Sequence, residues 1–252
     1  MTLDTDRLRP KGKANRLTLR DGSVHTPFGI FSKFIPHSLF EKVATHTNVY
    51  AEAKCAGAGR KWRATTSGEL KAFVGLTIYM GIFKCPRLED YWDRTGSGPL
   101  HSIMNCMTLY RFQQLKRFLH IYHPSTDGSS EWFFNKFEPL ISHVRYMSKK
   151  LWVPAHKVSV DIIMFMNYGR SAETVRMRNN PIGAGFKLWA LSDAGYVVSF
   201  YPHSNRNPWK DSAEYKSKLS HSSAVVARLR DDLPRALPGI TGRVQYVVFM
   251  DN

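Results

Sequence analysis

The chain has 252 residues, of which 43% are hydrophobic and 13% aromatic, enough apolar material for one large core or two smaller ones. This composition excludes a disordered chain. The formal net charge is +16, so a polyanion is the first partner to consider, although a basic domain with no nucleic-acid role stays open.

Cysteine content and hydropathy bear on the cellular compartment. Cys55, Cys85 and Cys106 contain no C-x-x-C pair, which predicts buried free thiols in a reducing compartment. The longest apolar run, residues 72–83, is too short to span a bilayer, and the start of the chain lacks the apolar segment of a signal peptide. We therefore expect an intracellular protein that contacts no membrane.

The first 152 residues have a helical pattern after a polar start. Residues 1–28 are basic and rich in Gly and Pro, and we expect a flexible arm there. Apolar side chains at helical spacing then predict four helices, within residues 36–53, 65–83, 108–122 and 137–152.

Two of these helices carry sharper expectations. The second opens with a Thr66-x-x-Glu69 capping box and is apolar nearly all round, so it should be a buried central helix. In the third, the period leaves Arg111, Lys116 and Arg117 pointing outward.

After Pro154 the period changes from helix to strand. Residues 157–169 form a long apolar run, and residues 186–201 give two strands around an Asp193-Ala-Gly195 turn, which together predict a three-stranded antiparallel meander. A short helix within 221–234 and a last strand within 243–252 follow. A right-handed crossover through that helix makes the last strand parallel to the first.

This topology suggests a site built from two aspartates. Asp161 lies within the first strand, between apolar residues on both sides, and Asp251 ends the last strand. On paired neighbours they would be about 4.8 Å apart, where two carboxylates bind Mg²⁺ or Mn²⁺ and support phosphodiester chemistry. The alternative, that Asp161 caps a bend and Asp251 starts a turn, stays open.

Basic residues surround the predicted site. Arg170, Arg176, Arg178 and Lys187 are placed where backbone phosphates of a nucleic acid would need neutralising. A solvated basic face explains them nearly as well.

The motifs resemble those of the piggyBac-type transposases and the host proteins derived from them. The resemblance extends over about residues 31–252, through NVYA, the TTSGELKAFVGLTIYMGI helix, PRLEDYW, RFQQLKRFLHIYH, SVD followed by YGRS, NNPIGAGFKLWALSDAGYVVSFY and the terminal DN. It implies a ribonuclease H-like catalytic part, a preceding helical part for dimer and DNA contacts, and three aspartates that hold two divalent metals for DNA cleavage and strand transfer.

Carried over residue by residue, the resemblance places the first family aspartate on Asp161 and the second on Asp251. Two departures stand out. Ile162 occupies a position where the family usually has Glu, and the family's third aspartate has no counterpart before the sequence ends at Asn252.

We therefore expect an α+β protein with a basic arm (1–28), a helical dimerisation or DNA-binding region (29–153) and a partial ribonuclease H-like domain (154–252). Its expected role is that of a nuclear, transposase-like module that binds double-stranded DNA. We expect it to be catalytically inactive and to hold Mg²⁺ or Mn²⁺ weakly, if at all. A homodimer is left open, and neither a membrane nor a small-molecule substrate is expected. The alternatives are an active cut-and-paste transposase and a decayed fragment with no maintained function.

Overall fold

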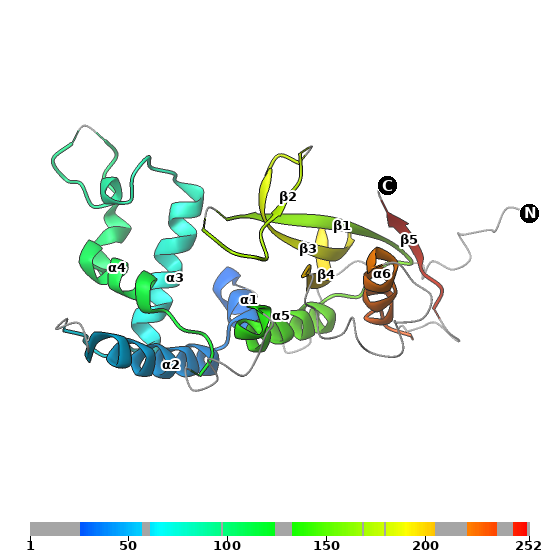
Figure 1. Ribbon diagram of the computed structural model, residues 1–252, viewed down its shortest axis with the longest axis horizontal. Helices are drawn as coiled ribbons and strands as arrows, with labels where there is room; N and C mark the ends of the chain where they lie inside the picture. The colour runs from blue at the N-terminus through cyan, green and yellow to red at the C-terminus, as the bar shows by residue number, and fades with distance from the viewer. Residues whose placement is uncertain are drawn as a thin grey trace, which may run out of the picture. The chain divides into compact units, whose positions relative to one another are not determined.

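The computed structural model describes residues 26–56, 61–96, 98–123, 133–167, 169–178, 180–204, 221–235 and 244–250 (Figure 1). The chain divides into two compact units. Residues 35–129 form the helical unit, and the segments up to residue 34 and from residue 130 onward form the sheet unit. This division differs from the boundary expected near residue 153, because the helix before that point packs on the sheet.

The helical unit contains the first three predicted helices, as α2 (His37–Ala56), α3 (Ser67–Ile82) and α4 (Leu109–Phe118). Two short 3-10 helices, η2 (Glu89–Tyr91) and η3 (Ser102–Cys106), lie between α3 and α4 in sequence. The apolar period of α4 is confirmed, since Phe112, Leu115 and Phe118 are buried. Lys116 and Arg117 are exposed, as expected.

Helix α3 is not buried all round, and the expectation of a fully buried central helix is wrong. Its buried side chains, Leu70, Phe73 and Leu76, lie on one face. Ile78 and Ile82 are 50% and 70% exposed. Helix α3 packs on α2 and η3, and within the described part of this unit those contacts cover only one side of the helix.

The start of α3 forms half of the predicted capping box. The Thr66 hydroxyl accepts a hydrogen bond from the Glu69 backbone amide at 3.2 Å. The Glu69 carboxylate does not reach back to the cap; it accepts hydrogen bonds from Arg111 Nε and Nη2 at 2.8 and 2.7 Å. Arg111 is therefore buried, at 6% exposure, and the expectation that it points outward is wrong.

The sheet unit combines helices from both ends of the chain. They are α1 (Pro27–Phe34), α5 (Glu138–Leu151) and α6 (His221–Asp231), with a 3-10 turn η5 (Phe133–Lys136) before α5. Helix α1 begins inside the segment expected to be a flexible arm, and it packs on α5. Residues 1–25 of that arm lie outside the described residues.

The sheet has the predicted connectivity. Strands β1 (Lys157–Met166), β3 (Ala184–Asp193) and β4 (Tyr196–Pro202) form the antiparallel meander, and β5 (Val247–Met250) pairs parallel to β1. A two-residue strand, β2 (Val175–Arg176), pairs with the start of β3. The order is β2-β3-β1-β5, with β4 also pairing with β3.

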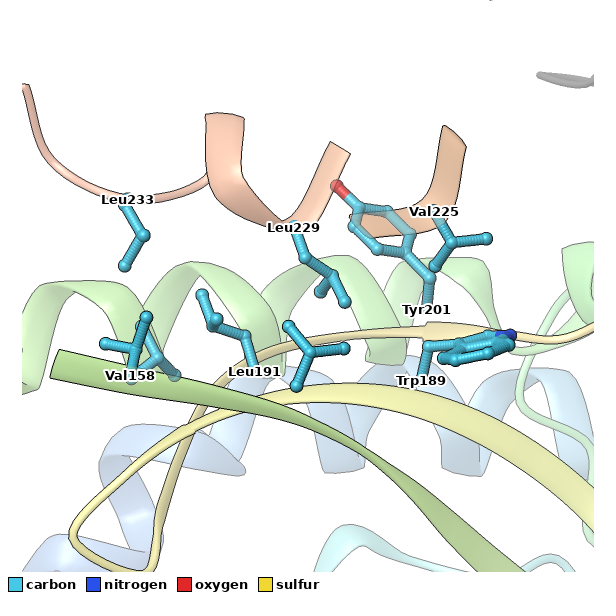
Figure 2. Packing of buried hydrophobic residues seen from close by; sticks show 9 residues of the cluster. Val158, Trp189, Leu191, Tyr201, Val225, Leu229 and Leu233 are labelled. Atoms are coloured by element: carbon cyan, nitrogen blue, oxygen red, sulfur yellow. The ribbon is translucent and has the colours of Figure 1, made fainter. Parts of the chain in front are cut away.

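The core of this unit lies between the sheet and α6. Figure 2 shows Val225 and Leu229 of α6, with Leu233 just beyond it, facing Val158, Leu191 and Trp189 of the sheet. Leu191 and Leu229 are fully buried. Burying a side chain of this size contributes about 1.5–3 kcal/mol, so this contact fixes which face of the sheet is covered.

A buried polar network ties α5 and α6 to β4. The Asp232 carboxylate accepts hydrogen bonds from the Ser199 and Tyr201 hydroxyls at 2.5 and 2.9 Å and from Lys149 Nζ at 2.6 Å. Arg145 completes the network with an ion pair to Asp232 at 3.5 Å.

In the described part of the chain, no helix combines the length and apolar character needed to cross a bilayer.

Candidate nucleic-acid interface

Asp161 lies in the middle of β1, on the face opposite the α6 core. Side chains alternate along the strand, so that Val158, Val160 and Met164 are buried while Ser159 and Asp161 are exposed. Apolar residues precede and follow Asp161 in the sequence, but they do not bury its side chain, because one face of β1 is open around it.

The strand pairing behind the predicted aspartate pair is confirmed up to the last described residue. Val160 of β1 is opposite Met250 of β5, and the two strands run in the same direction. Asp161 and Asp251 each come one residue later in the sequence. Asp251 lies outside the described residues, so the juxtaposition of the two carboxylates stays a prediction.

The described residues do not provide a complete divalent metal site. They contain no group of three or more His, Cys, Asp or Glu side chains arranged to hold an ion. Mg²⁺ and Mn²⁺ prefer several oxygen ligands, and here Asp161 is the only one of the predicted ligands that is described. The described carboxylates alone do not make up such a ligand set.

Three of the four predicted basic residues gather on a hairpin at the far end of β1. Arg170, Arg176 and Arg178 belong to the basic hairpin, residues 169–185, which is described except for residue 179. All three side chains are exposed, and within the described part of the chain none of them has a carboxylate partner. Figure 1 shows β2 at the end of the sheet opposite β5.

Close backbone packing and one side chain fix the base of this hairpin. A Cβ atom on Gly185 would lie 1.9 Å from the Phe165 carbonyl oxygen, so only glycine lets β3 approach β1 here. The Asn167 side chain organises the loop, since its Oδ1 accepts from Gly169 N at 3.1 Å and its Nδ2 donates to Thr174 Oγ1 at 3.0 Å. The arginines are thus carried on a defined loop and strand.

Lys187, the fourth predicted basic residue, lies on the opposite face of the sheet from Asp161. It pairs with Met164 in the sheet, whereas Asp161 pairs with Ala190, so Lys187 and Asp161 project from opposite faces. Its Nζ lies 4.2 Å from the centre of the Trp189 ring, and burial lowers the pKa of Lys187. The parity of the strand positions could have shown this, because residues 187, 189 and 191 share one face.

Comparisons with known proteins agree with this architecture. A family model described as Transposase IS4 matches residues 26–252. Human PiggyBac transposable element-derived protein 3 is 26% identical over 220 residues, covering 86% of this chain and 35% of the relative. Human PiggyBac transposable element-derived protein 2 is 25% identical over 178 residues, covering 70% of this chain and 29% of the relative.

A solved structure shows the same fold. The cryo-EM structure of the piggyBac transposase synaptic complex with hairpin DNA matches with a TM-score of 0.73 at 18% identity, over 86% of this chain and 45% of that one. This confirms the expected α+β fold with a ribonuclease H-like sheet. The chain spans only 35% and 29% of the two human relatives named above. Together these matches show that the chain belongs to the piggyBac transposase family.

Proposed function

We propose that this chain is a transposase-like module that binds double-stranded DNA through the basic hairpin, with little sequence preference. The observation that carries this proposal is the set of three exposed arginines, Arg170, Arg176 and Arg178, which lack carboxylate partners in the described part of the chain. Phosphate oxygens are the natural partners of such guanidinium groups.

Two further observations support DNA as the polyanion. The net charge of +16 favours a highly charged anionic partner over a small anion. The structurally similar piggyBac transposase was solved with hairpin DNA. The arginines are separated from Asp161 by about five residues of β1, or roughly 17 Å, which leaves room for a duplex to contact both.

Salt-dependent mobility shifts with a duplex of random sequence test the proposal. We expect affinity to fall steeply as salt rises from about 50 to about 200 mM, because each neutralised phosphate releases counterions. The triple variant Arg170→Gln, Arg176→Gln, Arg178→Gln should weaken binding and reduce the slope of log K against log salt by about 2 to 3.

A matched variant separates a local contact from overall charge. Lys42→Gln, Lys54→Gln and Lys150→Gln remove the same charge from exposed positions elsewhere. This control should keep nearly the full salt slope. Equal losses in the two triple variants would mean that the basic hairpin is not the binding surface.

For catalysis, we propose that a polypeptide of these 252 residues does not cleave or join DNA in Mg²⁺ or Mn²⁺. Two-metal phosphoryl transfer needs ligands that fix two ions about 4 Å apart, and Asp161 with Asp251 supplies only part of such a set. The relatives are longer, and activity of a whole protein of their length is a separate question. Supercoiled DNA incubated with the protein and with Asp161→Ala tests this. Metal-dependent nicking that disappears in the variant would overturn it.

We also propose that the module acts in the nucleus, where duplex DNA is available, which imaging of a fluorescent fusion protein tests directly. A fusion protein excluded from nuclei would contradict this proposal.

Self-association into a homodimer stays a prediction from the family resemblance. Sedimentation of the purified chain, with and without DNA, distinguishes a monomer from a dimer.

A further inference from the structure

A cysteine, a histidine and a tyrosine form a linked set in the helical unit, whereas the basic hairpin belongs to the sheet unit. Cys85 Sγ lies 3.4 Å from His101 Nε2, and His101 Nδ1 lies 2.8 Å from the Tyr79 hydroxyl. The expectation that these cysteines are buried is wrong for two of them, because Cys85 is partly exposed and Cys106 is exposed.

The positions of these three side chains come from different elements. Tyr79 belongs to α3, Cys85 to the loop after it, and His101 immediately precedes η3. The buried Tyr91 fixes the cysteine, since its hydroxyl accepts from the Cys85 backbone amide at 2.9 Å and donates to the Phe83 carbonyl at 2.6 Å. These hydrogen bonds fix the backbone of Cys85, from which the thiol reaches the imidazole.

This geometry suits transfer of a proton from sulfur to imidazole. A protonated imidazole would have an acceptor at each ring nitrogen, with the Tyr79 oxygen at Nδ1 and the Cys85 sulfur at Nε2. A nucleophile beside a base that is oriented by a third group is the arrangement that activates thiols in proteins. Lys84 precedes the cysteine in the sequence, and its positive charge suits an anionic reagent.

A metal site explains the set less well. Zinc sites use three or four protein ligands, and within the described residues Cys85 and His101 do not belong to any group of three or more ligand side chains. Cys106, only five residues after His101 in the sequence, is exposed and has no hydrogen-bond partner among the described residues. It provides an unactivated thiol in the same unit.

We propose that Cys85 is a reactive thiol, activated by His101 and positioned through Tyr79, that forms a reversible mixed disulfide with a low-molecular-weight disulfide such as oxidised glutathione. His101 Nε2 takes the thiol proton, and the sulfur anion attacks one sulfur of the disulfide. A new S–S bond forms to Cys85 while the original S–S bond breaks. The departing glutathione thiolate takes up a proton, so Cys85 is oxidised and half of the reagent is reduced.

The test compares two variants of the 252-residue chain that each keep one of these thiols. One carries Cys55→Ser and Cys106→Ser, and the other carries Cys55→Ser and Cys85→Ser. The rate of reaction with 5,5′-dithiobis(2-nitrobenzoic acid) is measured in native buffer and in guanidinium chloride, and the adduct with oxidised glutathione is detected by mass spectrometry. The unfolded protein gives the rate of each thiol without its neighbours.

We expect native Cys85 to react about tenfold faster than the same thiol in unfolded protein, while native Cys106 shows no acceleration. His101→Gln should remove the acceleration. Tyr79→Phe should reduce it severalfold and leave the Cys106 rate unchanged. Simple loosening of the fold would instead expose the thiol and raise its rate. A native Cys85 rate at or below the unfolded rate overturns the proposal, even if the His101 variant does not fold.

Discussion

The helical unit and the sheet unit each contain a carboxylate that links separate elements, but the two carboxylates are placed differently. Glu69 is in the first turn of α3 and receives Arg111 from the first turn of α4, so it joins the beginnings of two helices. Asp232 follows α6 and receives groups from α5 and β4, so it joins a helix end to the sheet.

Their electrostatics differ accordingly. The pKa of Glu69 is lowered from 4.5 to about 2, most strongly by hydrogen bonds from Arg111. Burial opposes this shift. A hydrogen bond from Thr65 and the charges of Arg111 and Arg63 lower the pKa further. For Asp232 burial is the largest effect and would raise its pKa. Hydrogen bonds from Lys149 and Ser199 and the Lys149 and Arg145 charges outweigh burial, so the pKa is lowered.

This difference indicates which unit depends more on its carboxylate. Ser199 and Tyr201 are buried, and without Asp232 their hydroxyls lose a buried acceptor while two cations lose their counter-charge. Without Glu69, Arg111 loses its partner but keeps the Arg63 carbonyl and the face of Trp62. The sheet unit should therefore be the more sensitive of the two.

The largest expected effect is that of Asp232→Asn. Breaking a buried charge network by removing one partner should lower the free energy of unfolding of the sheet unit by about 4 kcal/mol. Hydrogen exchange should then be faster in α5, β4 and α6 by roughly a thousandfold and nearly unchanged in α2, α3 and α4. Exchange measured on peptides from each unit reads the two effects separately.

The neighbouring Asp231→Asn provides the control. Asp231 pairs with Arg230 at the surface, with both side chains about half exposed, so its loss should cost less than about 0.5 kcal/mol. If both substitutions had the same effect, the Asp232 network would contribute nothing beyond a surface charge.

The second effect is that of Glu69→Gln, which should lower the stability of the helical unit by about 3 kcal/mol and leave the sheet unit unaffected. It also changes the response to acid. Because the pKa of Glu69 falls from 4.5 to about 2 on folding, its stabilisation is complete above pH 4.5 and is lost as the pH falls towards 2.

Urea unfolding at several pH values measures this response. The unsubstituted protein should lose helical-unit stability between about pH 5 and pH 2, whereas the Glu69→Gln protein should lose less over the same range. The exposed Glu41, whose ion-pair partner among the described residues is His37, provides the control variant Glu41→Gln. A parallel pH dependence in the Glu69 variant and the unsubstituted protein would assign the acid sensitivity to other groups.

What the sequence predicted depends on the range of the interaction. Apolar periodicity predicted α2, α4, α5, α6 and the meander, and the handedness of the crossover predicted that β5 runs parallel to β1. The helices and the meander were predicted from residues close together in the sequence, and the direction of β5 was predicted from a general rule about chain handedness.

Side-chain environment was harder to predict. Arg111 reads as a surface residue of an amphipathic helix, but its partner Glu69 is 42 residues away and no local pattern connects them. The exposure of Ile78 and Ile82 depends on what packs against α3, and the proximity of Cys85 to His101 depends on a loop. Lys187 is an exception, because the alternation of side chains along a strand is enough to place it on the opposite face of the sheet from Asp161.

The smallest expected effect concerns the caps that position the Glu69–Arg111 pair. Thr66 accepts from the Glu69 amide, and Thr108 accepts from the Arg111 amide, both at 3.2 Å, so the two partners occupy the same position in their helices. Helix α5 of the sheet unit has no side-chain cap.

Thr66→Ala and Thr108→Ala should each destabilise the helical unit by about 1 kcal/mol, while serine at either position should retain most of the stability. Each alanine frees one end of the ion pair, so in the double variant the second substitution should cost less than it does alone. Urea unfolding of the single and double variants measures this coupling. Fully additive losses would mean that the caps stabilise their own helices but do not position the Glu69–Arg111 pair.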